Sequence, residues 1–310
     1  MHAKQPRTLP FFKYHGLGND FVLIDAITTP TLTRRDWHDL SRKLCNRRFG
    51  IGADELLLLT RSKTAHVAMR VFNADGTDGG MCGNGIRCIA RHMCDQHGFK
   101  HSTLQVAVYG VGERTMHIVR KGLRSFAAAQ VDMGTPHLAP QLIPCAASLA
   151  NASHDSSPAI IGVALPASLR KSLGSAGSVI DSMTCVNMGN PHAVLWCQGR
   201  NKPTRELVEA IGPVLQRSPL FPRSVNVHVA AVTSRVRAVI WTYERGSGVT
   251  LACGTGACAV LVAGVLAGKL ARTATITVPG GDLGVYWDNT TERVIKSGPG
   301  ELVFTGSCRV

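Results

Sequence analysis

The sequence is poor in acidic and aromatic residues. Asp and Glu number 20 against 34 Lys and Arg among its 310 residues, which gives a formal net charge of +14, and aromatic residues make up 5%. This balance permits nucleic-acid binding, but the basic residues are scattered and no nucleic-acid-binding motif occurs. We therefore expect a solvated basic surface and no nucleic-acid partner. A basic nucleic-acid-binding module remains the non-enzyme alternative.

Long hydrophobic runs are also missing. The longest, residues 257–267, is shorter than the roughly 18 residues expected of a membrane-spanning helix. Pro6, Pro10 and Lys13 interrupt the N-terminal region where a signal peptide would have its apolar core. We expect a cytoplasmic protein with no membrane partner.

Cysteine is present ten times, but no Cys-x-x-Cys pair occurs. Cys82, Cys88 and Cys94 are each six residues apart, a poor match to the spacing of zinc ligands. In a long cytoplasmic chain, cysteines are more often reduced than paired in disulfides. We predict no metal site, and the missing motif disfavours a dithiol redox protein.

What the sequence does contain is a duplicated pattern. Residues 82–85 and 253–256 both read Cys-Gly-x-Gly, and each stretch precedes helix-forming sequence, at 86–96 and 257–267. The offset of 171 residues from Cys82 to Cys253 recurs between other polar residues: Asn19 and Asn190, Glu55 and Asn226, Asn73 and Glu244. We interpret the repeated offset as an internal duplication that produces two pseudo-symmetric lobes with a cleft between them.

The order of elements predicts an α+β fold in which each lobe is a mostly antiparallel sheet or barrel wrapped around a central helix. The helix after Cys253 has almost no polar face, so we expect it to be buried on all sides. Thr33 is a candidate N-cap for a helix that runs to about Arg47. Residues 135–158 are rich in Pro, Ala, Ser and His, and we expect them to form an interlobe excursion or a surface insertion without chemistry.

Both motif cysteines are expected at helix N-termini, beside backbone N–H groups and the positive end of the helix dipole. This environment predicts thiol pKa values lowered from about 8.5 towards neutrality. Inversion of a carbon acid needs a base on one face and an acid on the other, which two cysteines from symmetry-related lobes can supply. A disulfide redox couple is the other chemistry that uses two facing thiols.

The two helix N-termini can also bind a substrate carboxylate through their N–H groups. Gly83 and Gly254 would let the backbone approach it closely. Asn73 and Glu244 can hold an α-ammonium, with Glu244 supplying the opposite charge. No sequence context suggests a pyridoxal lysine, so we expect a mechanism without a cofactor.

Four stretches together resemble the diaminopimelate epimerase family: residues 13–21, residues 72–76 with 81–88, residues 188–192, and residues 244–248 with 252–256. The resemblance implies an isomerase that converts LL-diaminopimelate to the meso form in lysine and peptidoglycan synthesis. It implies Cys82 and Cys253 as the catalytic acid/base pair, and usually a homodimer. A cysteine-pair racemase of another amino acid, such as proline, is the nearest alternative.

The resemblance also implies roles for further residues and two lobes that share the last strand. The N-terminal lobe would be residues 1–127 completed by 299–310, and the C-terminal lobe residues 128–298. The reacting carboxylate would be bound by Gly83, Asn84, Gly254 and Thr255, the ammonium by Asn73 and Glu244, and the distal amino-acid head by Asn19, Asn190, Asn226 and Arg245. His192 and Glu244 match positions that tune the thiols. Family members often carry Gln where this chain has Glu55, which we keep as a candidate substrate-binding residue.

Overall fold

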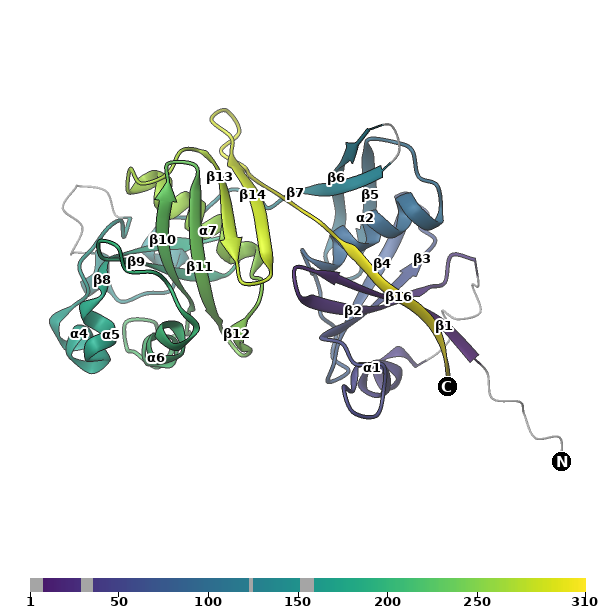
Figure 1. Ribbon diagram of the computed structural model, residues 1–310, viewed down its shortest axis with the longest axis horizontal. Helices are drawn as coiled ribbons and strands as arrows, with labels where there is room; N and C mark the ends of the chain where they lie inside the picture. The colour runs from purple at the N-terminus through teal and green to yellow at the C-terminus, as the bar shows by residue number, and fades with distance from the viewer. Residues whose placement is uncertain (1–7, 29–35, 123–124, 151–158) are drawn as a thin grey trace. The chain divides into compact units, whose positions relative to one another are not determined.

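The structure, a computed structural model, describes residues 8–28, 36–122, 125–150 and 159–310. The chain forms two compact units (Figure 1). The first comprises the chain up to Val131 together with Gly298–Val310, and the second comprises Asp132–Ser297.

The first unit is a sheet with the strand order β16-β1-β2-β3-β4-β5-β6-β7. Its strands are β1 (Thr8–Gly16), β2 (Asn19–Asp25), β3 (Glu55–Thr60), β4 (Val67–Asn73), β5 (Thr103–Val108), β6 (Gly112–Lys121), β7 (Ser125–Asp132) and β16 (Glu301–Arg309). Strands β2 and β3 run parallel, as do β4 and β5, and the other neighbours are antiparallel. Parallel neighbours need a crossover connection, which α1 (Trp37–Cys45) and α2 (Gly85–Gln96) provide.

The second unit has the strand order β8-β9-β10-β11-β13-β14-β15, with β12 paired to β11. These are β8 (Ile180–Asn187), β9 (Pro191–Cys197), β10 (Asn226–Ser234), β11 (Arg237–Glu244), β12 (Gly248–Thr250), β13 (Thr273–Val278), β14 (Gly281–Trp287) and β15 (Val294–Gly298). The parallel pairs β9–β10 and β11–β13 are bridged by α6 (Arg205–Gln216) and α7 (Gly254–Leu266). Among the described residues between β7 and β8, the chain forms four short helices: η2 (Pro140–Leu142), α3 (Ala147–Ala150), α4 (Ala167–Leu173) and α5 (Ser175–Ser178).

The two units repeat one topology, which confirms the predicted duplication. The parallel pairs and their crossover helices fall at the same places in both strand orders. The packing repeats as well. A Cβ on Gly85 would lie 3.0 Å from Leu57, and one on Gly256 would overlap the ring of His228. Both glycines and both partners are related by the 171-residue offset, so α2 and α7 begin against the same point of equivalent strands.

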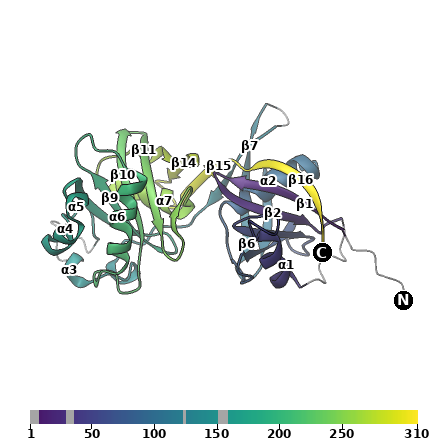
Figure 2. The ribbon, with the colours of Figure 1, turned by 60° about the horizontal axis from the view of Figure 1, so that its bottom comes forward.

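Of the crossover helices, α7 and α2 are the ones that begin at the repeated glycines, and both are largely buried in their own unit. Residues Gly256–Gly264 of α7 are all buried, and α7 packs against β8, β9, β10, β13 and β14, strands from both ends of the sheet (Figure 1). The sheet therefore curves around the helix, as its lack of a polar face predicted. Helix α2 packs against β1 and β16, which run side by side in Figure 2.

Two local predictions turn out differently. Thr33 lies outside the described residues, and the N-cap of α1 is Asp36, whose carboxylate accepts hydrogen bonds from the backbone N–H groups of His38 and Asp39. The helix ends at Cys45 because the Asn46 side chain accepts from the backbone N–H groups of Arg48 and Phe49 and forms a turn.

The described part of residues 135–158, which we expected to form an interlobe excursion or a surface insertion, is anchored to the core of the second unit. Ile143 and Leu149 are fully buried in the hydrophobic core of the second unit, and the His137 and Asn187 backbones exchange hydrogen bonds. Composition did not show this, because Ile143 and Leu149 lie among Pro, Ala and Ser residues. Residues 151–158 lie outside the described part of the chain.

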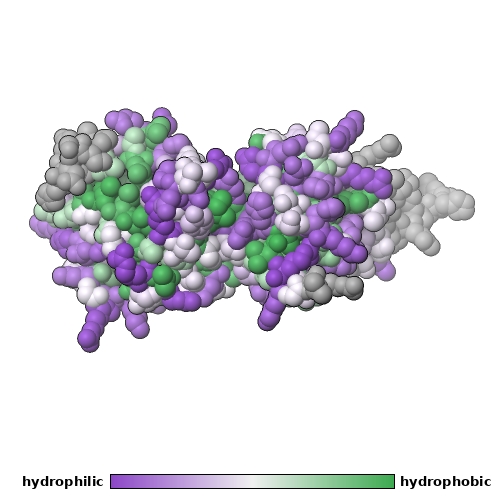
Figure 3. Space-filling model, turned by 90° about the horizontal axis from the view of Figure 1, so that it is seen from above, coloured by the Kyte–Doolittle hydropathy of each residue, from purple (hydrophilic) through white to green (hydrophobic). Residues whose placement is uncertain are grey.

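Within the described residues, no helix is both long and apolar enough to cross a membrane. Figure 3 shows one face of the molecule, on which hydrophilic side chains predominate and hydrophobic ones gather in separate patches.

A buried polar cluster ties the end of α2 to β2. Asp25 Oδ2 lies 3.1 Å from His92 Nε2 and 2.7 Å from His97 Nε2, and the Tyr14 hydroxyl lies 3.3 Å from His92 Nδ1. Burial alone would raise the pKa of Asp25, but hydrogen bonds from His92, the Ile27 backbone and His97 outweigh it and lower this pKa to about 2. The ionised carboxylate is therefore stabilised in the folded state.

Replacing Asp25 with Asn should lower the free energy of unfolding by about 1–3 kcal/mol, because buried donors lose an ionised acceptor. Since the folded pKa lies below the unfolded value, the contribution is complete above about pH 4 and is lost as the pH falls through about 2. Urea unfolding of the wild type and Asp25→Asn between pH 2 and pH 7 checks this. The exposed Glu113→Gln serves as control, and equal stability of all three proteins at pH 7 would contradict the prediction.

Candidate active site

In the first unit, Cys82 lies in the loop that leads into α2. Its Sγ accepts a hydrogen bond from the Gly85 backbone N–H at 3.4 Å and lies 3.9 Å from Asn19 Oδ1. The Asn84 side chain donates to the same oxygen of Asn19 at 3.1 Å. Three predicted site residues therefore meet at the start of α2.

Buried Arg87 fixes this loop. Its guanidinium donates to Asn84 Oδ1 and to the Gly83 carbonyl oxygen, both at 3.0 Å, and to the Pro299 carbonyl oxygen at 3.0 Å. Asn19 is anchored from its other side, where its amide donates to Asp54 at 2.9 Å. The backbone N–H groups of Gly83 and Asn84 precede the first turn of α2, where helical N–H groups have no intrahelical acceptor.

In the second unit, Cys253 is the N-cap residue of α7. Its thiol donates to Glu244 Oε2 at 3.0 Å and lies 3.7 Å from the Thr255 hydroxyl. The other carboxylate oxygen of Glu244 accepts from the Thr250 hydroxyl at 2.6 Å. The carboxylate is thus held on β11 with one oxygen directed at the thiol.

The prediction that both thiols have lowered pKa values is wrong for this structure. Burial raises the pKa of Cys82 and of Cys253 well above the ordinary thiol value. The negative charge of a neighbouring carboxylate and its hydrogen bond add to the increase, from Glu55 at Cys82 and from Glu244 at Cys253. Backbone N–H groups at the helix start act in the opposite direction but are outweighed, so both cysteines are thiols at neutral pH.

Glu55 and Asn73 form a cross-strand pair on β3 and β4. The Asn73 amide donates to the Thr77 hydroxyl at 2.8 Å and so also stabilises the turn after β4. In the second unit, the register of β10 and β11 brings Asn226 and Glu244 to the equivalent place. Both units therefore carry one glutamate and one asparagine at the ends of paired strands, with their positions exchanged.

Asn226 and Arg245 lie together. Asn226 Oδ1 accepts from the Arg245 backbone N–H at 2.9 Å, and the Asn226 amide donates to the Pro191 carbonyl oxygen at 3.0 Å. The Arg245 side chain is exposed and donates to the Arg223 carbonyl oxygen through Nη1 at 3.1 Å.

His192 belongs to a buried chain of polar side chains. Its Nε2 lies 2.7 Å from Asn190 Oδ1, its Nδ1 lies 2.8 Å from His228 Nε2, and His228 Nδ1 lies 2.9 Å from the Thr242 hydroxyl. Because Asn190 Oδ1 only accepts, His192 donates through Nε2, His228 donates to His192, and Thr242 donates to His228.

Both rings of this chain are neutral at pH 7. Burial, followed by the electrostatic effects of nearby His228 and Arg245, lowers the pKa of His192 well below its ordinary value, and burial lowers the pKa of His228 to about 3. A neutral His192 exerts no full charge on a thiol. Its predicted role in tuning a cysteine stays a prediction, and its link to α7 runs through His228, which packs against Gly256.

Sequence reasoning did not select Thr250, His228 or Lys296. Thr250 orients Glu244, His228 packs under the start of α7, and buried Lys296 places its Nζ where a side chain on Gly254 would lie. At the 171-residue offset, Thr250 corresponds to Gly79 and His228 to Leu57. The duplication therefore carried no signal for them.

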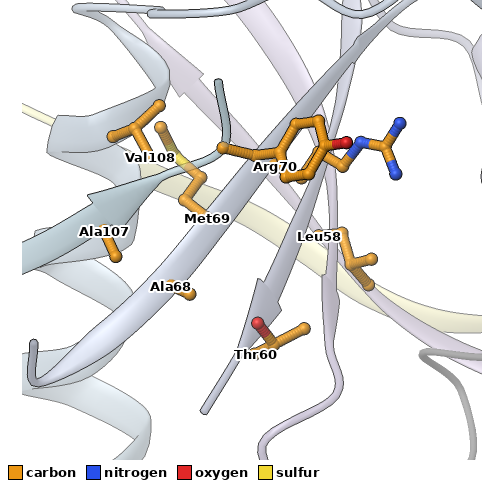
Figure 4. Close-up of a pocket in the computed structure, with 8 residues that line it drawn as sticks. Leu58, Thr60, Ala68, Met69, Arg70, Ala107 and Val108 are labelled. Atoms are coloured by element: carbon orange, nitrogen blue, oxygen red, sulfur yellow. The ribbon is translucent and has the colours of Figure 1, made fainter. Parts of the chain in front are cut away.

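An open pocket of about 280 Å³ lies elsewhere in the first unit, on β3, β4 and the end of β5 (Figure 4). It is lined by Leu58, Thr60, Ala68, Met69, Arg70, Ala107, Val108 and Tyr109. The guanidinium of Arg70 lies 4.2 Å from the centre of the Tyr109 ring and pairs with Asp78. None of the predicted site residues lines this pocket, and its lining is chiefly apolar.

Metal-binding side chains come together once within the described residues, in the cluster of Asp25, His92 and His97, whose ligand atoms lie within 4.8 Å of one another. The hydrogen bonds between them account for that proximity. The cluster includes neither of the two motif cysteines.

Solved structures show the fold class of the protein. A phenazine biosynthesis protein of the PhzF family from Bacillus anthracis superposes with a TM-score of 0.70, at 14% identity over 98% of this chain and 100% of that one. A hydroxyproline epimerase from Agrobacterium vitis superposes with a TM-score of 0.63, at 14% identity over 99% and 94%. The fold is thus shared with an amino-acid epimerase, and the predicted two-lobed α+β class is confirmed.

The sequence identifies the family within this class. A family model described as diaminopimelate epimerase matches residues 11–139 and 184–305. The diaminopimelate epimerase of Carboxydothermus hydrogenoformans is 39% identical over 298 residues, which cover 96% of this chain and 98% of the relative. This chain belongs to the diaminopimelate epimerase family, as the resemblance of its motifs predicted.

Gly256→Ala should destabilise the second unit by about 1–3 kcal/mol, because the new methyl group overlaps the buried His228 ring and displaces the first turn of α7. Thermal unfolding measures the loss. The control is Gly284→Ala on β14, where a methyl group would make an ordinary 3.6 Å contact with Ser297. Equal melting temperatures for the two variants would show that the start of α7 is not held by His228.

Proposed function

We propose that this chain interconverts LL- and meso-diaminopimelate by proton transfer at one α-carbon. The observation that carries the proposal is a repeated one. Each unit places a cysteine beside a carboxylate at the start of its central helix, in a chain that belongs to the diaminopimelate epimerase family.

In this proposal, Cys82 and Cys253 are the two acid/base groups. One cysteine, as thiolate, removes the α-proton from one face, and its Sγ becomes an S–H group. The other, as thiol, delivers its proton to the opposite face and becomes the thiolate. The reverse reaction exchanges these roles, so net charge and proton count stay constant through each turnover.

The substrate itself would help to form the thiolate. The carboxylate of Glu244 raises the pKa of Cys253 in the free protein. An α-ammonium group bound by Glu244 and Asn73 brings a positive charge that offsets this carboxylate. Binding would then favour release of the thiol proton to solvent, which leaves one thiolate and one thiol before the α-proton is removed.

The reacting carboxylate would be bound by backbone N–H groups at the starts of α2 and α7, from Gly83 and Asn84 and from Gly254 and Thr255. These groups have no helical acceptor, and the helix dipole favours an anion there. Hydrogen bonds to this carboxylate stabilise the negative charge that develops when the α-proton leaves. The proposal requires no cofactor.

The distal amino-acid head would be held by Asn19, Asn190, Asn226 and Arg245, with Arg245 pairing to the distal carboxylate through its planar fork. The motif resemblance further supports a role in lysine and peptidoglycan precursor synthesis, in the cytoplasm and as a homodimer. These finer statements rest on the resemblance of the motifs.

Cys82→Ser and Cys253→Ser should each reduce epimerisation by at least about 10²- to 10⁴-fold, because serine is far less acidic than cysteine. The remaining cysteine should still exchange the α-proton presented to its own side. Mass-resolved deuterium incorporation into separated LL and meso isomers should show opposite preferences in the two variants. Wild-type interconversion by either variant would rule out the two-base mechanism, and proline serves as the control substrate.

Arg245→Lys should lower kcat/KM for diaminopimelate about 10- to 100-fold, because lysine cannot make the bidentate pair with the distal carboxylate. Steady-state kinetics in both directions measure the loss. The matched control is Arg237→Lys on β11, whose exposed side chain pairs with Asp282. An unchanged kcat/KM in the Arg245 variant would remove this residue from the binding site and reopen the choice of substrate.

A further inference from the structure

We propose that Glu55 is the carboxylate that holds and orients the Cys82 thiol, the counterpart in the first unit of Glu244 beside Cys253. This inference rests on the proposed function, because it assigns a positioning residue to one of the two proposed acid/base groups. It gives Glu55 a task other than the substrate contact expected from its sequence position.

The first support is the exchanged placement of glutamate and asparagine in the two units. Glu55 begins β3 and pairs with Asn73 at the end of β4. In the second unit, Asn226 begins β10 and Glu244 ends β11. The two strand pairs are related by the duplication, so each unit has one carboxylate at this location. In the first unit it lies on the first strand of the pair, and in the second unit it lies on the second strand.

The second support is the environment of the Glu55 carboxylate. Its Oε2 atom is buried, and its negative charge and hydrogen bond both act on Cys82. The same two effects act on Cys253 from Glu244, whose Oε2 accepts the thiol hydrogen bond at 3.0 Å. The two cysteines thus share one kind of partner although the partners differ in sequence origin.

The other polar groups at Cys82 do not provide this charge. Asn19 and the Gly85 backbone N–H are neutral. The Arg87 cation donates to Asn84 and to the carbonyl oxygens of Gly83 and Pro299. Glu55 is therefore the charged side chain that acts on this thiol from β3.

A second carboxylate has a consequence for an enzyme that works in both directions. If only Cys253 had a carboxylate neighbour, its proton affinity would exceed that of Cys82, and one protonation form of the pair would dominate. A carboxylate at each thiol brings the two affinities closer together. Both starting forms, each with one thiolate and one thiol, are then accessible.

The test measures each thiol directly in the full-length protein. Protein labelled with ¹³C at cysteine Cβ is titrated by NMR, and the signals are assigned with Cys82→Ser and Cys253→Ser. Glu55→Gln should lower the titration midpoint of the Cys82 thiol by about one pH unit, a tenfold change in its thiolate fraction. The titration midpoint of the Cys253 thiol should not change. Glu244→Gln should lower the midpoint of Cys253 and leave that of Cys82 unchanged. Glu55→Asp should shift the Cys82 midpoint by less than Glu55→Gln does. The exposed Glu113→Gln should shift neither midpoint.

Kinetics of the same variants separate positioning from substrate binding. A positioning role predicts that Glu55→Gln lowers kcat several-fold with KM nearly unchanged. A raised KM with an unshifted Cys82 midpoint would overturn the inference and return Glu55 to substrate recognition. Equal shifts at both cysteines would also overturn it, because they would indicate a general loosening of the fold.

The experiments distinguish a failure of the proposed epimerase function from a failure of the proposed role of Glu55. A wild-type chain that does not epimerise diaminopimelate would refute the proposed function. The thiol midpoints would still decide whether Glu55 acts on Cys82, since the titration needs no substrate.

Discussion

The contact between each central helix and the strand beneath it is the constraint on which both half-sites depend. A glycine in the first turn lets α2 lie against Leu57 and α7 lie against His228 with no side chain between them. Each motif cysteine stands three residues before its glycine, so the contact fixes where the thiol emerges. At this position Cys253 is buried and Cys82 is partly buried.

Burial changes the chemistry of those thiols. A helix N-terminus favours a thiolate, yet here the loss of solvent and the adjacent carboxylates are larger effects and raise both pKa values. Both cysteines are therefore protonated in the free protein. In a proton-transfer enzyme this makes the charge of the arriving substrate part of the activation, because an ammonium group counteracts the carboxylates.

The sequence predicted the outline of the fold and the residues that meet in each half-site. The repeated offset indicated the duplication, and the apolar composition of residues 257–267 indicated a buried helix. It did not predict the buried chain from Asn190 to Thr242, because His228 and Thr242 have no polar equivalents in the first unit. The burial of Ile143 was missed for a similar reason, since composition does not show which loop residue reaches a core.

The amino-acid sequence by itself determined the repeat, the order of strands and helices, and the family, because these depend on local pattern and on residue identity. Tertiary structure alone decided the protonation of Cys82 and Cys253. A thiol pKa depends on how deeply the sulfur is buried and on which carboxylate lies beside it. Those carboxylates come from strands that reach the helix only when the sheet has folded around it.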